Sequence, residues 1–283
     1  DTDNGFDLAL SKIISTETQT TLEGPLAMLP AGEVLATFDL GFDWKRIESS
    51  DTRSATGAEL TRRRISTGTN LVVPLTSRRD EFLDALGDFT LNLQAGFEDL
   101  SDAGMLGDWN AGITWKPVDG LDLSATYIWR EVAPGLAALG NPQIVNLNVP
   151  VFDFVRGETV LADVTTGGNP DLLAETQRDL KVSASYDFDL FDRASIRAEY
   201  FRNNSENTTE GFPLLTPAIE AAFPDRVTRA ADGTLLAVDR RAVTFAERRS
   251  SRIRYGINLF GRVGKPSPQS EGGGGGRGGF RAM

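Results

Sequence analysis

The chain has 283 residues, which is enough for one or two domains, and its net charge of −11 argues against a protein that binds nucleic acid. It contains no cysteine and no histidine, so disulfides are excluded, and zinc, copper, haem and Ser-His or Cys-His catalytic sites are not expected. The sequence has no run of about 18 apolar residues, which excludes a membrane-spanning helix but not a membrane barrel, whose strands need only about 10 alternating residues each.

The longest alternation of apolar and polar residues lies near the start of the chain. Asp1 to Ser15 shows no pattern and is predicted to be a loop tail, and Thr16 to Leu29 is predicted to be a weak strand. After a short turn, the alternation from Glu33 to Lys45 predicts a strand with one apolar and one polar face. The apolar face carries Val34, Ala36, Phe38, Leu40, Phe42 and Trp44.

Two further strands are predicted before the middle of the chain, from Thr61 to Thr76 and from Phe89 to Glu98. Pro74 should lie at a bulge or at the end of its strand, because proline cannot donate a ladder hydrogen bond. The predicted connections around these strands are Glu48 to Leu60, Ser77 to Asp88 and Asp99 to Leu106.

The clearest pattern is a hairpin from Gly107 to Pro134. Two alternating runs flank Pro117 to Gly120, and the Asp-Gly pair in this segment is typical of a hairpin turn. The aromatic residues favour membrane-interface girdles over a carbohydrate-stacking platform, because they share the apolar face. We expect Trp115 to mark the inner interface, and Trp109 and Trp129 the outer one.

Two long connections with little alternation divide the second half of the chain, Glu131 to Glu175 and Asn203 to Arg241. Residues 264–283 are rich in proline and glycine and are predicted to form a flexible periplasmic segment. The strands predicted in this half are Leu180 to Phe188, Ser195 to Tyr200 and Arg252 to Leu259.

The order of the connections places tight turns at one end of the sheet and long loops at the other. This sorting is typical of outer-membrane barrels, which have periplasmic turns and longer extracellular loops. The predicted fold is all-β: residues 1–263 form an antiparallel transmembrane β-barrel segment of about nine strands, with long extracellular loops near residues 131–175 and 203–241. Open edges and an odd strand number do not suit a membrane barrel, so we expect the segment to belong to a larger barrel or to be completed by other chains.

Three short stretches resemble TonB-dependent outer-membrane receptors. Gly168 to Leu172 (GNPDL), followed by Glu175 and Thr176, resembles the stretch in which a late extracellular loop of these receptors descends into a barrel strand. Leu29 to Val34 (LPAGEV) and Asn70 to Leu75 (NLVVPL) resemble a turn and a strand end of the same family. The resemblance implies a barrel of about 22 strands with a plugged lumen, in the outer membrane of a Gram-negative cell.

The chain departs from the family pattern at two loop positions. Ala174 stands where the family usually has proline, and Val132 stands where it usually has arginine before Ala-Pro. We find no plug domain, TonB box or terminal aromatic strand in the sequence, so the implied contact with the TonB complex would run through a missing plug.

We expect the ligand to be bound by the two long loops and the lumen mouth, because long loops commonly carry recognition. The residues expected to contact it are Arg130, Glu131, Phe152, Phe154, Asn169 and Asp171. No catalytic residue, metal ligand or cofactor is predicted, and the protein is not expected to be an enzyme.

Two basic stretches, Arg62 to Arg64 and Arg248 to Arg254, allow two interpretations. They could bind anionic ligands or lipopolysaccharide phosphates, because arginine forms forked contacts with phosphate. The favoured interpretation is that alternate arginines line the polar lumen and pair with acidic neighbours.

For three weaker motifs we favour an interpretation that involves no specific ligand. A calcium loop at Asp1 to Asp7 is disfavoured, because Lys12 stands where a bidentate glutamate is needed. Asp187, Asp189 and Asp192 are expected to be solvated turn carboxylates. The RGG-like residues 272–280 are expected to be a flexible insertion.

Three functions stay open on the sequence. The favoured one is an outer-membrane receptor that takes up a scarce small-molecule nutrient, such as a ferric siderophore, another metal complex, a vitamin or an oligosaccharide, in a TonB-dependent way. The alternatives are a passive porin-like or adhesive barrel and a soluble β-sheet binding module. The expected partners of the receptor are the nutrient, the TonB complex, outer-membrane lipid and lipopolysaccharide, and other chains that complete the barrel, but not nucleic acid.

Overall fold

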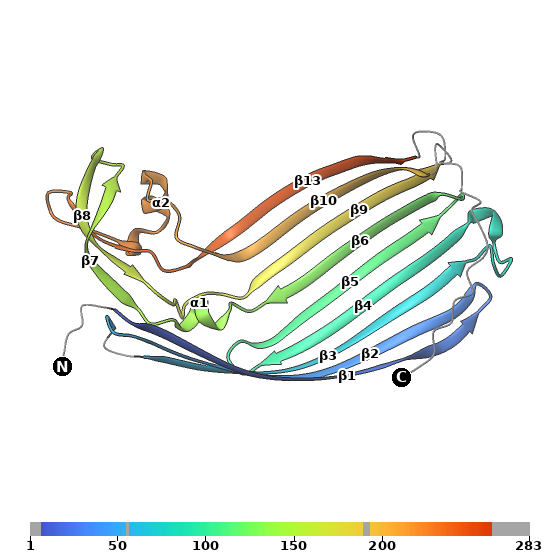
Figure 1. Cartoon of the computed structure of the whole chain (residues 1–283), viewed down its shortest axis with the longest axis horizontal. Helices are drawn as coiled ribbons and strands as arrows, with labels where there is room; N and C mark the ends of the chain where they lie inside the picture. Colours follow the sequence, from blue (N-terminus) through green and yellow to red (C-terminus); the bar gives the residue numbers. More distant parts are fainter. Residues whose placement is uncertain (1–6, 55–56, 189–192, 262–283) are drawn as a thin grey trace, which may run out of the picture.

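A computed structural model describes residues 7–54, 57–188 and 193–261. Nine antiparallel strands form one open sheet, with β1 and β13 at its edges (Figure 1). The all-β antiparallel class and the count of about nine strands are confirmed. The strands of this sheet are β1 (Ala9–Leu29), β2 (Gly32–Asp51), β3 (Ala58–Thr76), β4 (Asp88–Leu100), β5 (Gly104–Lys116), β6 (Leu121–Val132), β9 (Glu175–Phe188), β10 (Arg193–Glu210) and β13 (Val243–Phe260).

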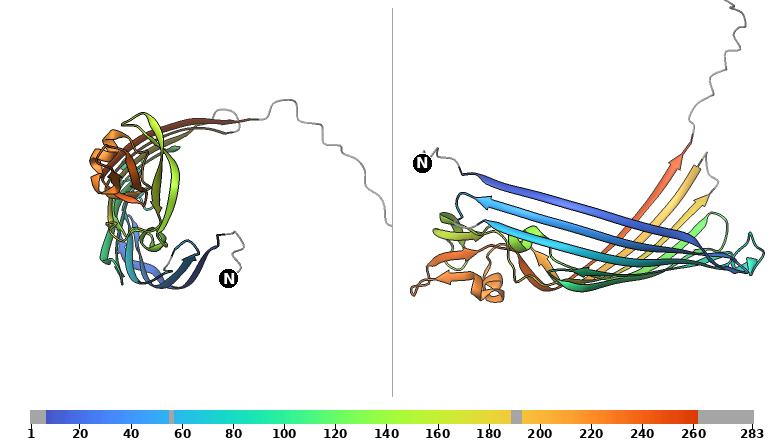
Figure 2. Two further views of the ribbon diagram at one scale, coloured as in Figure 1. Left: turned by 90° about the vertical axis from the view of Figure 1, so that its left-hand side faces the viewer. Right: turned by 90° about the horizontal axis from the view of Figure 1, so that it is seen from below.

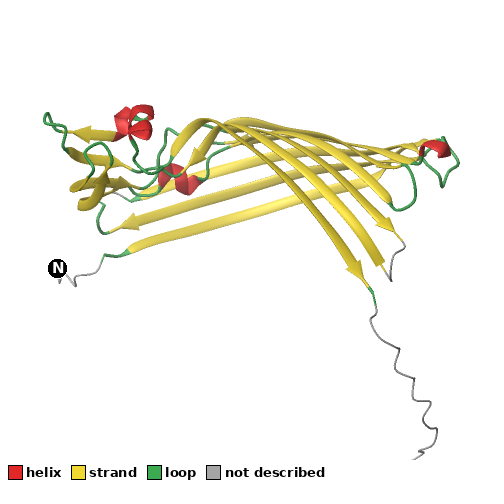
Figure 3. Cartoon of the chain, turned by 90° about the horizontal axis from the view of Figure 1, so that it is seen from above, coloured by secondary structure: helices red, strands yellow, loops and turns green. Residues whose placement is uncertain are grey.

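The nine-stranded sheet is a single curved and twisted layer (Figures 2 and 3). Its apolar face carries the alternating hydrophobic side chains, many of them exposed, such as Leu40 at 60% and Tyr255 at 83%. Its polar face carries charged and hydroxyl side chains that bond across strands, such as Ser124 and Ser183 at 2.6 Å. An apolar face of this extent suits contact with hydrocarbon and not with water.

Most strands at the loop end of the sheet are longer than the alternation predicts. The prediction of a loop tail up to Ser15 is wrong, because β1 begins at Ala9 and pairs with the end of β2 at Asp51. The predicted connection from Asn203 is also too long, since β10 continues to Glu210. These extensions are held by backbone hydrogen bonds together with polar side-chain contacts, such as Ser11 with Ser49 and Arg248 with Glu210. Where no apolar band is buried on one face, no period of two is required.

Two sequence predictions about local geometry are confirmed. The register between β3 and β4 shifts between Pro74 and Thr76, so the proline lies at an irregularity of the ladder. Gly120 adopts a φ of +79° in the turn between β5 and β6, and a Cβ there would lie 2.4 Å from the carbonyl oxygen of Asp187. Glycine suits this turn because it avoids both the strained backbone and the clash.

The two long connections show little alternation in the sequence, yet both contain regular secondary structure. They contain a second, four-stranded sheet in the order β11-β12-β8-β7, in which β12 pairs with β8 in parallel. β11 and β12 have only 3 and 5 residues, and β7 exposes apolar side chains, Leu147 at 67% and Phe152 at 46%, so no face of β7 is uniformly polar. The elements are α1 (Leu136–Gly140), β7 (Ile144–Asp153), β8 (Glu158–Thr166), α2 (Pro217–Ala222), the 3-10 turn η2 (Pro224–Arg226), β11 (Val227–Arg229) and β12 (Leu235–Asp239).

At the opposite end lie tight turns and the connection between β3 and β4, which contains the 3-10 turn η1 (Asp84–Leu86) (Figure 1). The predicted sorting of short and long connections is therefore present. Within the described residues, none of the helices has the length and apolar character needed to cross a membrane. Residues 1–6 of the calcium motif, Asp189 and Asp192, and the segment 264–283 lie outside the described residues.

Candidate functional site

Residues 133–174 and 211–242 fold together into one unit, which we call the loop body. Its two halves are far apart in the sequence but meet where β12 pairs with β8, with Val238 opposite Val164. Its core is formed by Val151, Ala162, Val164, Leu215, Leu235 and Val238. Because this core takes side chains from both connections, neither half can bury its apolar residues without the other.

A partly buried guanidinium joins the two halves a second time. Arg229 donates to both carboxylate oxygens of Asp153 at 2.7 and 3.0 Å, and to both oxygens of Glu220 at 2.6 and 2.7 Å. The hydrogen bond from Arg229 is the main reason that the pKa of Asp153 lies below its ordinary value. Two forked carboxylate contacts on one guanidinium fix the relative position of β7, α2 and β11.

A second charged cluster lies at the end of β12. Asp239 accepts hydrogen bonds from Arg226 at 2.5 Å and from Arg241 at 2.7 Å. Burial alone would raise the pKa of Asp239, but the hydrogen bonds from Arg241 and the charges of the two arginines lower it below its ordinary value. The backbone N–H of Arg240 donates to Thr165 O, which extends the contact to β8.

The loop body begins against the polar face of the nine-stranded sheet. Arg62 of β3 binds Asp102 with both ends of its fork at 2.7 to 3.0 Å, and it also donates to the carbonyl oxygen of Pro134 at 2.9 Å. The helix α1 rests on β3 so closely that a Cβ on Gly140 would lie 2.0 Å from Leu60 Cδ1. The loop body is therefore anchored on the side of the sheet that would face the lumen.

A hollow of about 380 Å³ lies beside this anchor on the polar face. Its floor contains Arg64, which donates to Asp43 at 2.6 Å and to Glu98 at 3.3 Å. Glu17 and Lys45 complete its charged wall. The paired charges nearly cancel, so the hollow offers both donors and acceptors rather than a strong field of one sign. The sequence analysis favours alternate arginines of the stretch from Arg62 to Arg64 as lumen residues, but it does not indicate this hollow, which depends on strand register.

The loop body exposes the two phenylalanines that the sequence predicts to contact ligand. Phe152, at the end of β7, is 46% exposed, and Phe154, in the following turn, is 40% exposed. Their rings pack edge to face with centroids 4.8 Å apart. An exposed aromatic pair on a supported hairpin can stack against a planar ligand, and burial of the pair by a ligand would be favourable.

Arg130 and Glu131 are not brought together by the structure. Arg130 lies on the polar face, where its Nε donates to Gln177 Oε1 at 2.5 Å. Glu131 lies on the opposite face, and its Oε2 accepts from the backbone N–H of Gly107 at 3.0 Å. Because successive residues of a strand point to opposite faces, only Arg130 is positioned at the lumen mouth.

Asn169 and Asp171 occupy different environments in the loop body. Asn169 is 2% exposed, donates to the carbonyl oxygen of Ala242 at 2.9 Å and accepts from the backbone N–H of Asp171 at 3.1 Å. Its side chain therefore ties the two halves of the loop body together and is not available at the surface. The side chain of Asp171 is exposed.

No group of three or more acidic side chains that could hold a metal ion occurs in the part of the chain that the structure describes. The arrangement offers instead a supported aromatic surface, a charged hollow and a polar wall below them. Together with the lipid-compatible opposite face, these features are typical of a section of a transmembrane β-barrel with a folded unit at one end of its wall.

The family comparison agrees with this class. The model of the TonB dependent receptor-like, beta-barrel family matches residues 2–233, and the chain belongs to this family. No curated protein matches the chain.

Solved structures with a similar fold include three receptors from other bacteria. The siderophore receptor PirA from Pseudomonas aeruginosa is 16% identical with a TM-score of 0.55, over 87% of this chain and 39% of that one. PirA from Acinetobacter baumannii is 13% identical with a TM-score of 0.59, over 89% and 35%. The hemophore receptor HasR from Serratia marcescens is 12% identical with a TM-score of 0.52, over 89% and 40%. The chain thus spans between 35% and 40% of these relatives, and at such identities the likeness shows the fold alone.

Proposed function

We propose that the chain forms part of the wall and two outer loops of an outer-membrane receptor that captures a scarce nutrient and admits it to the lumen in a TonB-dependent way. The observation that carries this proposal is the loop body, which is built from both long connections and anchored on the polar face through Arg62 and Pro134. A passive pore needs no folded unit of this kind at its mouth. Residues of the loop body, with Arg130 at the rim, would contact the ligand.

The substrate class that we favour is a metal chelate or another compound with planar groups. Phe152 and Phe154 present aromatic surface, while Arg130 and the charged hollow beside Arg64 offer polar contacts below it. The names of the similar structures support this class, since they are receptors for siderophores or for a hemophore carrying heme. We assign no covalent chemistry to the protein.

Uptake of ⁵⁵Fe-labelled ferric enterobactin and of heme by cells that carry the full receptor tests the proposal. We expect accumulation of at least one probe, abolished by an uncoupler of the proton-motive force. Replacing Phe152 and Phe154 together by alanine should weaken binding about tenfold or more, because two stacked aromatic contacts are lost. Phe260→Ala, an exposed aromatic change outside the loop body, is the matched control and should leave binding unchanged.

Two outcomes would contradict the proposal. Entry of small solutes that is insensitive to the uncoupler would support the passive barrel. Failure of a range of metal chelates, vitamins and oligosaccharides to bind, in cells where the protein is correctly inserted, would support an adhesive barrel.

A further inference from the structure

The strand register separates the arginines at the loop end into two groups on opposite faces. Arg178 of β9 is in register with Asn204 of β10, and Asn204 is in register with Arg249 of β13. Arg202 lies on the same face, two residues before Asn204. This is the apolar face, because Tyr200 and Tyr255 share it. With neighbouring strands about 4.8 Å apart, the register places the backbones of three arginines close to that of Asn204.

The charges of this arginine cluster are only partly balanced. Arg178 pairs with Glu206, and Arg249 pairs with Glu247. Arg202 is exposed and has no ion-pair partner among the residues that the structure describes. The Oδ1 atom of Asn204 is buried and has no hydrogen-bond partner there either. Arg202 therefore keeps a guanidinium without an ion-pair partner in the described part of the chain, and the acids of this face, Glu131, Glu206 and Glu247, lie in the next row toward the loop end.

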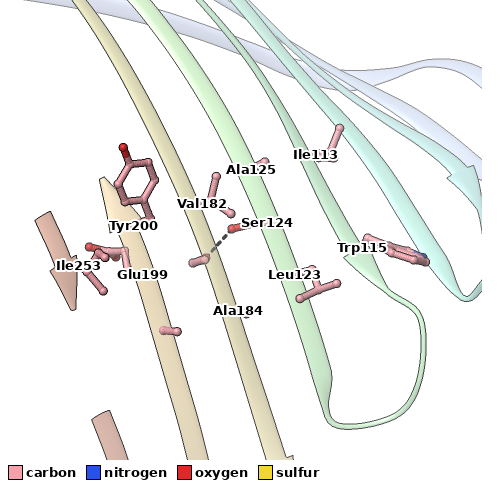
Figure 4. A pocket seen from close by; sticks show the side chains of 12 residues that line it. Ile113, Trp115, Leu123, Ser124, Ala125, Val182, Ala184, Glu199, Tyr200 and Ile253 are labelled. Carbon is pink, nitrogen blue, oxygen red and sulfur yellow. Dashed lines mark hydrogen bonds between the residues drawn. The ribbon is translucent and has the colours of Figure 1, made fainter. Parts of the chain in front are cut away.

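An apolar hollow of about 510 Å³ lies on the same face (Figure 4). Its floor is low because β6, β9 and β10 place alanines there, Ala125, Ala184 and Ala198. Larger side chains surround the floor, with Trp115 at one side and Tyr200 and Ile253 at the other (Figure 4). The side chains that line it are almost entirely apolar.

The hollow and the arginine cluster are adjacent along the same three strands. Val182, Tyr200 and Ile253 form one row at the rim of the hollow. Arg202 lies one row further toward the loop end, and the row of Arg178 and Arg249 lies one beyond that. At about 3.3 Å per residue, the arginine row is about 13 Å from the rim of the hollow. A polar headgroup and the first part of an acyl chain span this distance.

We propose that this face binds a phosphate-bearing lipid of the outer leaflet, with phosphate on the arginine cluster and an acyl chain in the apolar hollow. Arginine suits this role because its fork contacts phosphate oxygens in pairs. A free anion would not occupy the apolar hollow, and an uncharged lipid would not form an ion pair with Arg202. The proposal uses the membrane orientation of the family but does not depend on which nutrient the receptor takes up.

The test compares lipid binding by the full chain in zwitterionic detergent micelles. Diphosphoryl lipid A with brominated acyl chains is titrated in, and quenching of tryptophan fluorescence is measured, with Trp115 as the reporter in the hollow. The outer variant carries Arg178→Gln, Arg202→Gln and Arg249→Gln. The matched control carries Lys181→Gln, Arg197→Gln and Arg254→Gln, which removes the same charge from the same three strands on the polar face.

We expect the native chain and the control to bind lipid A with equal affinity and the outer variant to bind about tenfold or more weakly, since charge-assisted contacts to phosphate are lost. Dephosphorylated lipid should bind all three proteins as weakly as the outer variant binds lipid A. Ala184→Phe, which fills the hollow, should weaken lipid A binding while the arginines stay in place. Far-ultraviolet circular dichroism checks that each variant keeps its strands.

Three results would overturn the proposal. The outer variant and the control could lose affinity equally, which would indicate a general charge effect. The native chain could bind dephosphorylated lipid as tightly as lipid A. Inorganic phosphate at millimolar concentration could displace the lipid, which would indicate a site for free anions.

Discussion

The Nη1 and Nη2 atoms of Arg229 donate to the Oδ2 and Oδ1 atoms of Asp153 at 2.7 and 3.0 Å. This forked contact joins the two long connections through residues that lie 76 positions apart in the sequence. Asp153 is 1% exposed, so water cannot take the place of its carboxylate beside Arg229 when that carboxylate is removed. We expect Asp153→Asn to lower the local free energy of unfolding of the loop body by about 2–4 kcal/mol, because it removes the buried carboxylate that accepts two hydrogen bonds from Arg229. Hydrogen exchange of the amides in β7, β8 and β12 measures this change.

Arg156→Gln is the matched control for that prediction. Arg156 pairs with Glu158 of the same hairpin at 2.8 Å and donates to Thr234 Oγ1 of the other connection at 2.9 Å, but the side chains of this ion pair are 40% and 49% exposed. Its loss should change the stability of the loop body by about 0.5 kcal/mol or less. Equal effects of the two substitutions would show that Asp153 contributes no more than a surface ion pair.

The two low carboxyl pKa values in the loop body predict a dependence of its stability on pH. The folded-state pKa values of Asp153 and Asp239 lie below the unfolded value of 3.8. A group with a depressed folded pKa contributes stability that is fully present above the unfolded pKa and is lost as pH falls through the folded pKa. The stability of the loop body should therefore be constant from neutral pH to about 5 and should fall below about 4.

Hydrogen exchange over the same amides, corrected for the intrinsic rate at each pH, checks this expectation. In the Asp153→Asn variant the decrease below about pH 4 should be smaller, because one of the two titrating groups is gone. A native protein whose loop body loses stability already between pH 7 and 5 would contradict the assignment to these carboxylates.

Leu235 and Leu236 allow a direct test that both connections share one core. Leu235 is fully buried, and its neighbour Leu236 is 48% exposed. Leu235→Ala should destabilise the loop body by about 2–5 kcal/mol, whereas Leu236→Ala should cost about 1 kcal/mol or less. The diagnostic result is that Leu235→Ala increases exchange in β7 as well as in β12, although β7 belongs to the other connection. Increased exchange confined to residues 211–242 would show two independent loops.

The parts of the fold that could be predicted from the sequence are the strands whose two faces lie in different environments. Strands with one face toward hydrocarbon show a period of two, so the apolar stripe from Val34 to Trp44 and the hairpin around Gly120 could be located, and the class followed from them. The extensions of β1 to Ala9 and of β10 to Glu210 lie beyond the apolar stripes, and backbone pairing leaves no trace in side-chain pattern.

The candidate site was predictable only in its location. Long connections at one end indicate where recognition occurs, and Phe152 and Phe154 are exposed there. The burial of Asn169 could not be predicted, because it depends on contacts between distant segments, whereas the separation of Arg130 from Glu131 follows from the alternation of successive residues in a strand. The loop body itself gave little signal, since its short strands pair across connections, one of them in parallel.

The turn between β5 and β6 provides the last prediction, because a single glycine carries both its backbone geometry and its fit against the next strand. Gly120 has a φ of +79°, its carbonyl oxygen accepts from the backbone N–H of Asp187 at 2.8 Å, and an added Cβ would lie 2.4 Å from Asp187 O. Gly120→Ala should lower the free energy of unfolding of the sheet by about 1–3 kcal/mol. Urea titration followed by the fluorescence of Trp115 and Trp129, which lie on this hairpin, measures the change.

Gly24→Ala is the control, because a Cβ at this position of β1 meets no atom within 4 Å and the backbone is extended. It should be neutral or stabilise the protein slightly, since alanine loses less conformational entropy than glycine on folding. If both substitutions had the same effect, backbone strain at Gly120 would be excluded as the cause. The expected difference follows from the hairpin and its contact with Asp187 of β9, so it should appear whether or not further strands pair with β1 and β13.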